Sequence, residues 1–160
     1  MRALPRLVIE PIVRAALLED LGRAGDITTD STIPDDARAT VALVSREPGV
    51  VAGLPLALLA WELVDPSISC DVHLPDGSRV EPGSVIATAS GPARGLLTGE
   101  RVALNFLGHL SGVATGTATL ADAIAQLPNL RELDLTGNRL HALPATLAHL
   151  RHLRRLYLDD

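Results

Sequence analysis

The sequence contains no lysine, since all fourteen of its basic residues are arginine. Its 160 residues also include one cysteine, Cys70, and only 2% aromatic residues. Without lysine the chain has no Schiff-base nucleophile and no phosphate-loop lysine. A single cysteine excludes an internal disulfide and a cysteine-rich zinc site. With 47% hydrophobic residues and so few aromatics, the core has to be built from aliphatic side chains.

Charge and hydropathy limit the partners and the compartment. The net charge of −5 argues against nucleic-acid binding, which normally uses a basic face. Residues 102–121 carry no charge, but their polar side chains and glycines argue against a helix in contact with lipid. We therefore expect this stretch to be buried protein interior, with no membrane partner. The lone cysteine suits a reducing compartment, and we expect a cytoplasmic protein.

Leucine content changes abruptly near Gln126. Leucine accounts for 18 of the first 126 residues and for 11 of the last 34. In the last part, a shift of 23 residues superposes leucine on leucine, beginning with Leu127 on Leu150. Residues 130–140 follow the spacing L-x-x-L-x-L-x-x-N-x-L, which is the signature of leucine-rich repeats. The tail therefore resembles a leucine-rich repeat.

This resemblance predicts how the tail folds. Leu133 and Leu135 should point inward from a short strand, and Asn138 should hydrogen-bond to the backbone where the chain turns. The pattern covers only about one and a half repeats, whereas a solenoid needs about three to bury its leucines. We expect the tail to pack on the first part, to bind a protein partner or to stay disordered.

The first part alternates between helical and strand patterns. Helical spacing predicts a first helix closed by Gly22, with a core face formed by Ile9, Ile12, Val13, Ala16, Leu17 and Leu21. A turn over 25–29 should follow, with Asp26 and Thr28 as turn and cap residues. Strands are expected over 39–46, 50–53, 68–74, 79–80 and 85–90. Helices are expected over 54–64, 98–110 and 111–126, the last capped by Ser111.

Three glycines and a histidine lie within the predicted helices. Gly108, Gly112 and Gly116 are spaced by four residues, which we interpret as tight packing and as a break at Ser111. His109 lies on an apolar stretch, so we interpret it as a core histidine rather than a base.

Several short words occur in order along the first part: EDLG (19–22), GDIT (25–28), REPGVVAG (46–53), DG and VEPG (76–83), LTGERVALNFL (97–107) and HLSGVAT (109–115). Together they resemble the amino-terminal domain of quinolinate phosphoribosyltransferase (nicotinate-nucleotide pyrophosphorylase). The resemblance implies an α+β fold, an open α/β sandwich with a mostly antiparallel sheet, without the family's α/β barrel. We place this domain at residues 1–119 and the leucine-rich-repeat segment at 120–160, with the junction within 118–127.

The resemblance also implies a reaction. The family converts quinolinate and phosphoribosyl pyrophosphate to nicotinate mononucleotide, pyrophosphate and carbon dioxide with magnesium, in NAD biosynthesis. In its dimer, the amino-terminal domain of one subunit covers the barrel mouth of the other. Arg101 is then the substrate-binding residue, and its planar, charged fork suits a dicarboxylate. The alternative is an ion pair between Arg101 and Glu100 or another acid.

The barrel would hold most of the active site. The resemblance therefore assigns no catalytic, cofactor-binding or metal-binding residue to this chain, and we expect no activity from it alone. A homodimer or a barrel-containing subunit is the expected partner. The alternative function is a protein-interaction module acting through the leucine-rich tail. We interpret His141, His149 and His152 as surface positions of the repeat, not as metal ligands.

The join between the two patterns lies in a segment that fits both. Residues 120–127 fit the last helix of the family domain and, shifted by 23, also match residues 143–150 of the repeat. A crossover inside such a segment would keep both sides locally consistent. We interpret the chain as a natural fusion, a recombined gene, a faulty gene model or a deliberate join.

Overall fold

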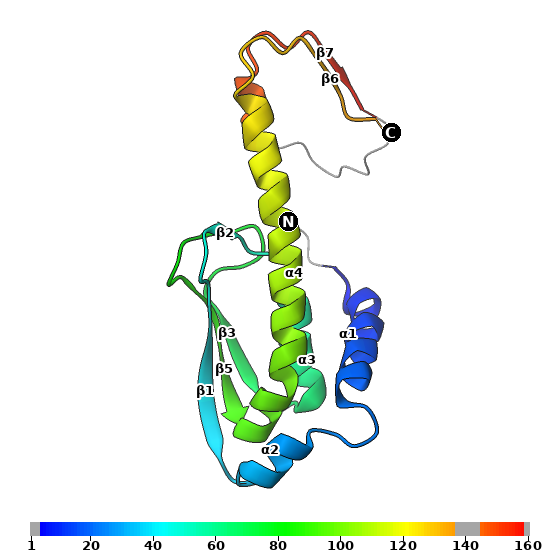
Figure 1. The fold of residues 1–160 in the computed structure, drawn as a ribbon, viewed down its shortest axis with the longest axis vertical. Coiled ribbons are helices and arrows are strands. Elements are labelled where there is room, and N and C mark those ends of the chain that lie inside the picture. Colours follow the sequence, from blue (N-terminus) through cyan, green and yellow to red (C-terminus); the bar gives the residue numbers. More distant parts are fainter. Residues whose placement is uncertain (1–3, 137–144, 159–160) are drawn as a thin grey trace. The chain divides into compact units, whose positions relative to one another are not determined.

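A computed structural model describes residues 4–136 and 145–158 of the protein. The chain divides into two compact units, residues 1–114 and residues 115–160. The first unit combines helices with antiparallel strands, and the second contains a pair of parallel strands. The described residues form no closed barrel. The fold is therefore the expected α+β class, and each unit is described separately (Figure 1).

The first unit begins with helix α1, Arg6–Leu21. The helix ends at Gly22, which has a φ of 56° and donates its backbone N–H to the carbonyl of Leu18. Its core face is formed by Ile9, Val13 and Leu17, which are buried. Ile12, by contrast, is 52% exposed, so the predicted core face was too wide. Helix α1 buries a narrower stripe because it packs mainly on one neighbour, helix α3 (Leu54–Val64).

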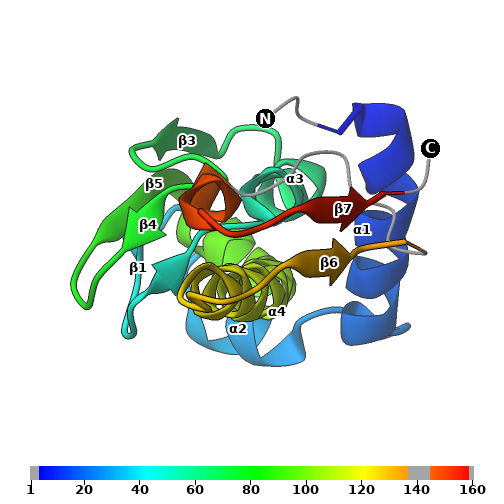
Figure 2. The same cartoon turned by 90° about the horizontal axis from the view of Figure 1, so that it is seen from above.

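A three-stranded antiparallel sheet forms one layer of this unit. Its strands are β1 (Arg38–Val44), β5 (Val85–Pro92) and β3 (Ser69–Val72), in the order β1-β5-β3. A second, two-stranded sheet pairs β2 (Gly49–Val50) with β4 (Arg79–Val80). Helix α3 and the first part of helix α4 (Ala93–Ala125) lie between the three-stranded sheet and α1 in both views (Figures 1 and 2).

The core between the sheet and the helices is aliphatic apart from one tryptophan. Trp61 of α3 is almost fully buried, and its Nε1–H donates to the carbonyl oxygen of Leu96 at 2.9 Å. Facing residues of β5, such as Ala87 and Ala89, are small and fully enclosed. The single large ring of the core is thus held by a hydrogen bond to α4, while β5 presents small side chains to the interior.

Close contacts in the first unit depend on glycines that differ from those predicted. A Cβ on Gly99 would lie 2.6 Å from Trp61 Cδ1, and one on Gly91 would lie 2.8 Å from Ile68 Cγ1. Gly108, Gly112 and Gly116 have no described atom within 4 Å of such a Cβ. The prediction of tight packing at these three glycines was therefore wrong. The crowded glycines Gly91, Gly95 and Gly99 are also spaced by four residues, so spacing alone cannot distinguish the two sets.

Helix α4, Ala93–Ala125, is one continuous helix of 33 residues. The prediction of two helices separated at Ser111 was wrong. The Ser111 hydroxyl accepts from the N–H of Ala52 at 3.0 Å and donates to the carbonyl of Ala52 at 3.2 Å. The serine therefore joins α4 to the segment before α3 instead of capping a new helix.

Burial along α4 also differs from the expectation. Of residues 102–121, Val102, Ala103, Leu107 and Ala121 are buried, whereas Val113 and Leu120 are exposed. One side of the helix packs while the other does not, so the stretch is not uniformly interior. Among the residues that the structure describes, no helix combines the length and the apolarity needed to cross a bilayer.

Two short segments differ from the prediction because helices begin there. Residues 27–32 form the short helix α2 (Ile27–Thr32), where a turn was expected. Strand β2 ends at Val50, although a strand to residue 53 was predicted. Gly53 has a φ of 87° and precedes the first turn of α3, a conformation that glycine adopts at little cost. The chain therefore leaves the strand in order to start the helix.

The second unit contains strands β6 (Glu132–Asp134) and β7 (Arg155–Tyr157) and a 3₁₀ turn, η1 (Ala145–His149). The strands are parallel, and Leu133 is paired with Leu156, which is the 23-residue shift seen in the sequence. Leu133 and Leu135 are half-buried. Asn138 and His141 lie outside the described residues.

Candidate functional site

Arg101 lies on α4 in the first unit, and its side chain is 75% exposed. Its Nη1 is 3.2 Å from Oδ1 of Asp20, near the end of α1. The Asp20 side chain is only 17% exposed. The acid paired with Arg101 is thus Asp20 of the EDLG word and not the adjacent Glu100. The ion pair still leaves most of the guanidinium in contact with solvent.

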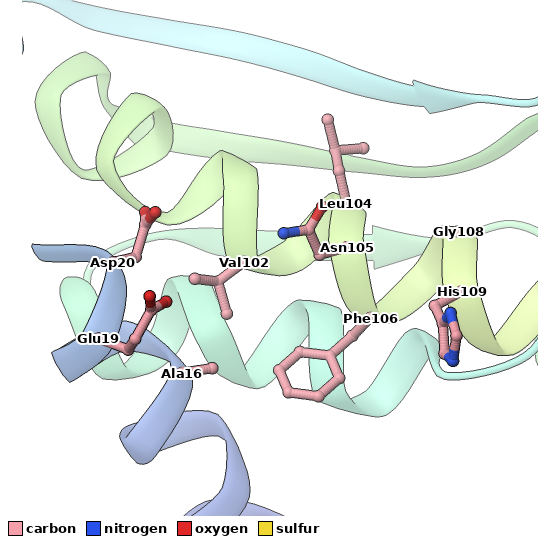
Figure 3. A pocket seen from close by; sticks show the side chains of 9 residues that line it. All are labelled: Ala16, Glu19, Asp20, Val102, Leu104, Asn105, Phe106, Gly108 and His109. Atoms are coloured by element: carbon pink, nitrogen blue, oxygen red, sulfur yellow. The ribbon is translucent and has the colours of Figure 1, made fainter.

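A groove of about 670 Å³ runs between α1 and α4 beside this ion pair. Helix α1 contributes Glu19 and Asp20 to it, and α4 contributes Asn105 and His109 (Figure 3). Asn105 and His109 follow Arg101 at intervals of four residues, so the three share one face of the helix. The groove is completed by Ala16, Val102, Leu104, Phe106 and Gly108. His109 is exposed, so the prediction of a core histidine was wrong.

A second carboxylate lies near Arg101. Asp26 caps α2 by accepting from the backbone N–H of Thr29 at 3.0 Å, and it accepts from Thr98 Oγ1 at 3.2 Å. Hydrogen bonds from Thr29, then from Thr98, and the charge of Arg101 hold the pKa of Asp26 below its ordinary value. The predicted cap role of Asp26 is confirmed. The segments 19–22, 25–28 and 97–107 therefore come close together in the fold. Each supplies one charged side chain, namely Asp20, Asp26 or Arg101.

Comparison with known proteins identifies the family. A family model for the N-terminal domain of quinolinate phosphoribosyl transferase matches residues 26–111. The chain belongs to the quinolinate phosphoribosyltransferase family. A second model, for the leucine rich repeat, matches residues 117–160. Both resemblances that the sequence predicted are thereby confirmed.

Individual members of the family agree with this assignment. The chain is 39% identical over 119 residues to the chloroplastic nicotinate-nucleotide pyrophosphorylase [carboxylating] of Oryza sativa subsp. japonica, covering 74% of this chain and 32% of that protein. A probable nicotinate-nucleotide pyrophosphorylase of Synechocystis is 42% identical over 124 residues, covering 78% of this chain and 41% of that protein. The chain thus spans well under half the length of these curated relatives.

Solved structures of the family show the same fold. The crystal structure of NadC from Streptococcus pyogenes matches with a TM-score of 0.74 at 31% sequence identity. That match covers 100% of this chain and 56% of the NadC chain. The protein from Francisella tularensis, a nicotinate-nucleotide pyrophosphorylase, gives a TM-score of 0.72 at 29% identity, over 82% of this chain and 46% of that one.

One more acid of the family words has a structural role that the sequence did not reveal. Asp76, in the Asp-Gly turn before β4, accepts from the backbone N–H groups of Gly53 and Leu54 at 3.1 and 3.0 Å. These N–H groups lie at the start of α3, where no helical partner is available. The pattern alone indicated only a turn, because the contact joins residues far apart in sequence.

Other candidate groups take part in no site that the structure describes. Cys70 is half-buried, and burial raises the pKa of its thiol, which makes it a poor nucleophile. His149 and His152 are exposed. Within residues 4–136 and 145–158, no three histidine, cysteine or acidic side chains are grouped so as to hold a metal ion.

Proposed function

We propose that the first part of this chain, residues 1–119, serves as the substrate-covering amino-terminal part of a quinolinate phosphoribosyltransferase. In this function Arg101 binds a carboxylate of quinolinate at a barrel mouth. Family membership supports the reaction class. The single observation that carries the role of Arg101 is its exposure, since 75% of the side chain remains accessible beside a groove.

The chemistry of a guanidinium fits this role. It carries a permanent charge and can donate two parallel hydrogen bonds to one carboxylate. The contact with Asp20 uses Nη1, which leaves Nε and Nη2 for a substrate oxygen. One exposed arginine positions one end of a dicarboxylate, but it cannot stabilise the charge on two anionic substrates by itself.

The remaining chemistry is assigned to the barrel of the family enzyme. The described acids of this chain form no group suited to Mg²⁺, which prefers several oxygen ligands and substrate phosphates. We therefore propose that magnesium and phosphoribosyl pyrophosphate bind to a barrel domain. The 160 residues by themselves would then be inactive, and their partner would be a second family subunit in the cytoplasm.

Supplying the barrel tests the proposal. The full chain is mixed with a barrel domain of a relative, and nicotinate mononucleotide is measured. Product should form with the unaltered chain, and Arg101→Ala should lower its rate by about tenfold or more, as for a lost charged hydrogen bond. Arg14→Ala is the matched control, because Arg14 pairs with Glu10 on α1 instead. If the mixture with the unaltered chain forms no nicotinate mononucleotide, the proposal is contradicted.

A second candidate function is protein interaction through the tail, in a chain that arose by fusion. It is favoured by the exposure of Leu156, Tyr157 and Leu158 around β7. A partner captured by the full chain should be lost when residues 127–160 are deleted and retained when Arg101 is replaced. Capture that survives the deletion would contradict this function.

A further inference from the structure

Asp20 provides a fixed point for a mobile side chain. Arg101 has four rotatable bonds and is 75% exposed, so without a partner its guanidinium would sample many positions. Asp20 is 17% exposed and lies on α1, whose neighbouring residues Val13 and Leu17 are in the core. The carboxylate is therefore held by a packed helix, and it contacts the guanidinium at 3.2 Å.

A second carboxylate, Asp26, interacts electrostatically with the same guanidinium. Asp26 is fixed by the backbone of Thr29 and by Thr98, which lies one turn before Arg101 on α4. The charge of Arg101 acts on this carboxylate. The guanidinium is thus attracted by acids from two different elements, the end of α1 and the start of α2.

We propose that Asp20 is a positioning residue for substrate binding, which holds Nη1 of Arg101 so that Nε and Nη2 remain directed to a substrate carboxylate. This inference rests on the proposed function of Arg101. A guanidinium that is ordered beforehand loses less conformational freedom when the substrate binds. Asp20 should therefore affect the affinity for the dicarboxylate and leave the chemical step on the barrel unchanged.

The neighbouring acid gives a matched control. Glu19 lies next to Asp20 and lines the same groove, but the contact at 3.2 Å belongs to Asp20. Asp20→Asn and Glu19→Gln remove one negative charge each and keep the shape of the side chain. Any effect of the overall charge of the groove is the same in both variants, so a difference between them reports the contact with Arg101. Asp20→Glu restores the carboxylate on a longer arm.

The first experiment needs no activity. In the full chain, the order parameter of the Arg101 Nε–H bond is measured by NMR relaxation, with the signal assigned through Arg101→Lys. The order parameter should be similar in the unaltered chain and in Glu19→Gln, and clearly lower in Asp20→Asn, because the guanidinium then loses its contact at Nη1. Equal order parameters in all three would overturn the inference even if the mixture with a barrel is active.

The second experiment measures kinetics in the mixture of the full chain with a relative's barrel. Asp20→Asn should raise the KM for quinolinate by about two- to fivefold with kcat unchanged. Glu19→Gln should leave KM unchanged, and Asp20→Glu should recover part of the loss. An unchanged KM in Asp20→Asn overturns this inference alone. An inactive mixture with the unaltered chain overturns the proposed function, and the inference with it.

Discussion

The two units of this protein use the same aliphatic residues with very different results. The first unit buries nineteen apolar side chains in one core between a sheet and helices. In the second, the buried side chains among the described residues are Ala121 and Leu150. Yet the second unit is the one richer in leucine. Apolar side chains are therefore buried where a sheet and helices can pack on each other, and a high leucine content alone does not bury them.

Local geometry follows the sequence equally well in both units. Strands β6 and β7 pair in the register that the 23-residue repeat requires, and Arg155 contacts Glu132 at 2.6 Å across this pair. A repeat can thus form its own strand contacts without enough neighbours to cover its leucines. Four pairs of substitutions test how strongly packing and hydrogen bonding stabilise each part of the chain.

The largest difference is expected between Trp61→Ala and Leu150→Ala. Removing the buried indole should destabilise the first unit by about 3–5 kcal/mol, as for other large core truncations. Leu150→Ala should leave the first unit unchanged. The measurement is urea unfolding by circular dichroism, and for Leu150→Ala also by tryptophan fluorescence, since Trp61 is the single tryptophan. Loss of the Trp61 transition in Leu150→Ala would show that the units fold together.

Gly99→Ala and Gly116→Ala compare two glycines of the same helix, α4. Both gain helix propensity, but the new Cβ of Gly99 would lie 2.6 Å from Trp61, whereas Gly116 has no described atom within 4 Å. We expect Gly99→Ala to destabilise the first unit by about 1–3 kcal/mol. Gly116→Ala should stabilise its helix by up to about 1 kcal/mol. The midpoints of thermal unfolding at 222 nm measure both effects, and a stable Gly99→Ala would contradict the packing.

Asp76→Ala removes the acceptor for the first N–H groups of α3. The expected loss is about 1–2 kcal/mol, as for a deleted helix cap. Asp71→Ala is the control, because Asp71 is an exposed acid on the nearby strand β3 and its loss should change stability by less than about 0.5 kcal/mol. Urea midpoints monitored at Trp61 compare the two, and equal midpoints would show that Asp76 does not act as a cap.

The smallest effect concerns pH. The pKa of Asp26 is lowered in the folded protein, so the unfolded chain binds its proton more readily. Its contribution to stability is therefore present above the unfolded pKa of about 3.9 and is lost as the pH falls below that value through the folded pKa. Asp26→Asn should make the free energy of unfolding less dependent on pH in this range, as measured by urea unfolding followed by Trp61 fluorescence.

Asp134, in the second unit, is the control for Asp26. Hydrogen bonds from the backbone and side chain of Thr136 lower the pKa of Asp134 in the same direction. Because Asp134 lies in the second unit, Asp134→Asn should leave the pH profile of Trp61 unfolding unchanged. An equal effect of both substitutions would contradict the separation of the two units.

Much of the fold could be predicted from the sequence, because it depends on local patterns. The end of α1 at Gly22, the extent of α3 and the parallel register of the tail follow from spacing and turn residues. The continuity of α4 could not be predicted, since the hydroxyl of Ser111 bonds to Ala52, a residue distant in sequence. The boundary expected within 118–127 stays a prediction.

The candidate site shows the same limit. The family words indicated Arg101, but its contact with Asp20 depends on how α1 packs beside α4, which spacing does not encode. The crowded glycines at 91, 95 and 99 have the same four-residue spacing as the open ones at 108, 112 and 116, and they differ only in having Ile68, Asp65 and Trp61 beside them. Residue roles set by partners across the fold therefore required the structure.

Hydrogen exchange of the full chain tests the contrast between the units most directly. Amides in the centre of the three-stranded sheet, such as Val41 and Ala89, should remain protected for hours, because they open only with the whole first unit. The N–H of Leu135, which donates to Tyr157 at 3.0 Å, should exchange within about a minute, because few buried contacts hold that strand pair. Equal protection of the two sets, or slower exchange in the tail, would contradict the account.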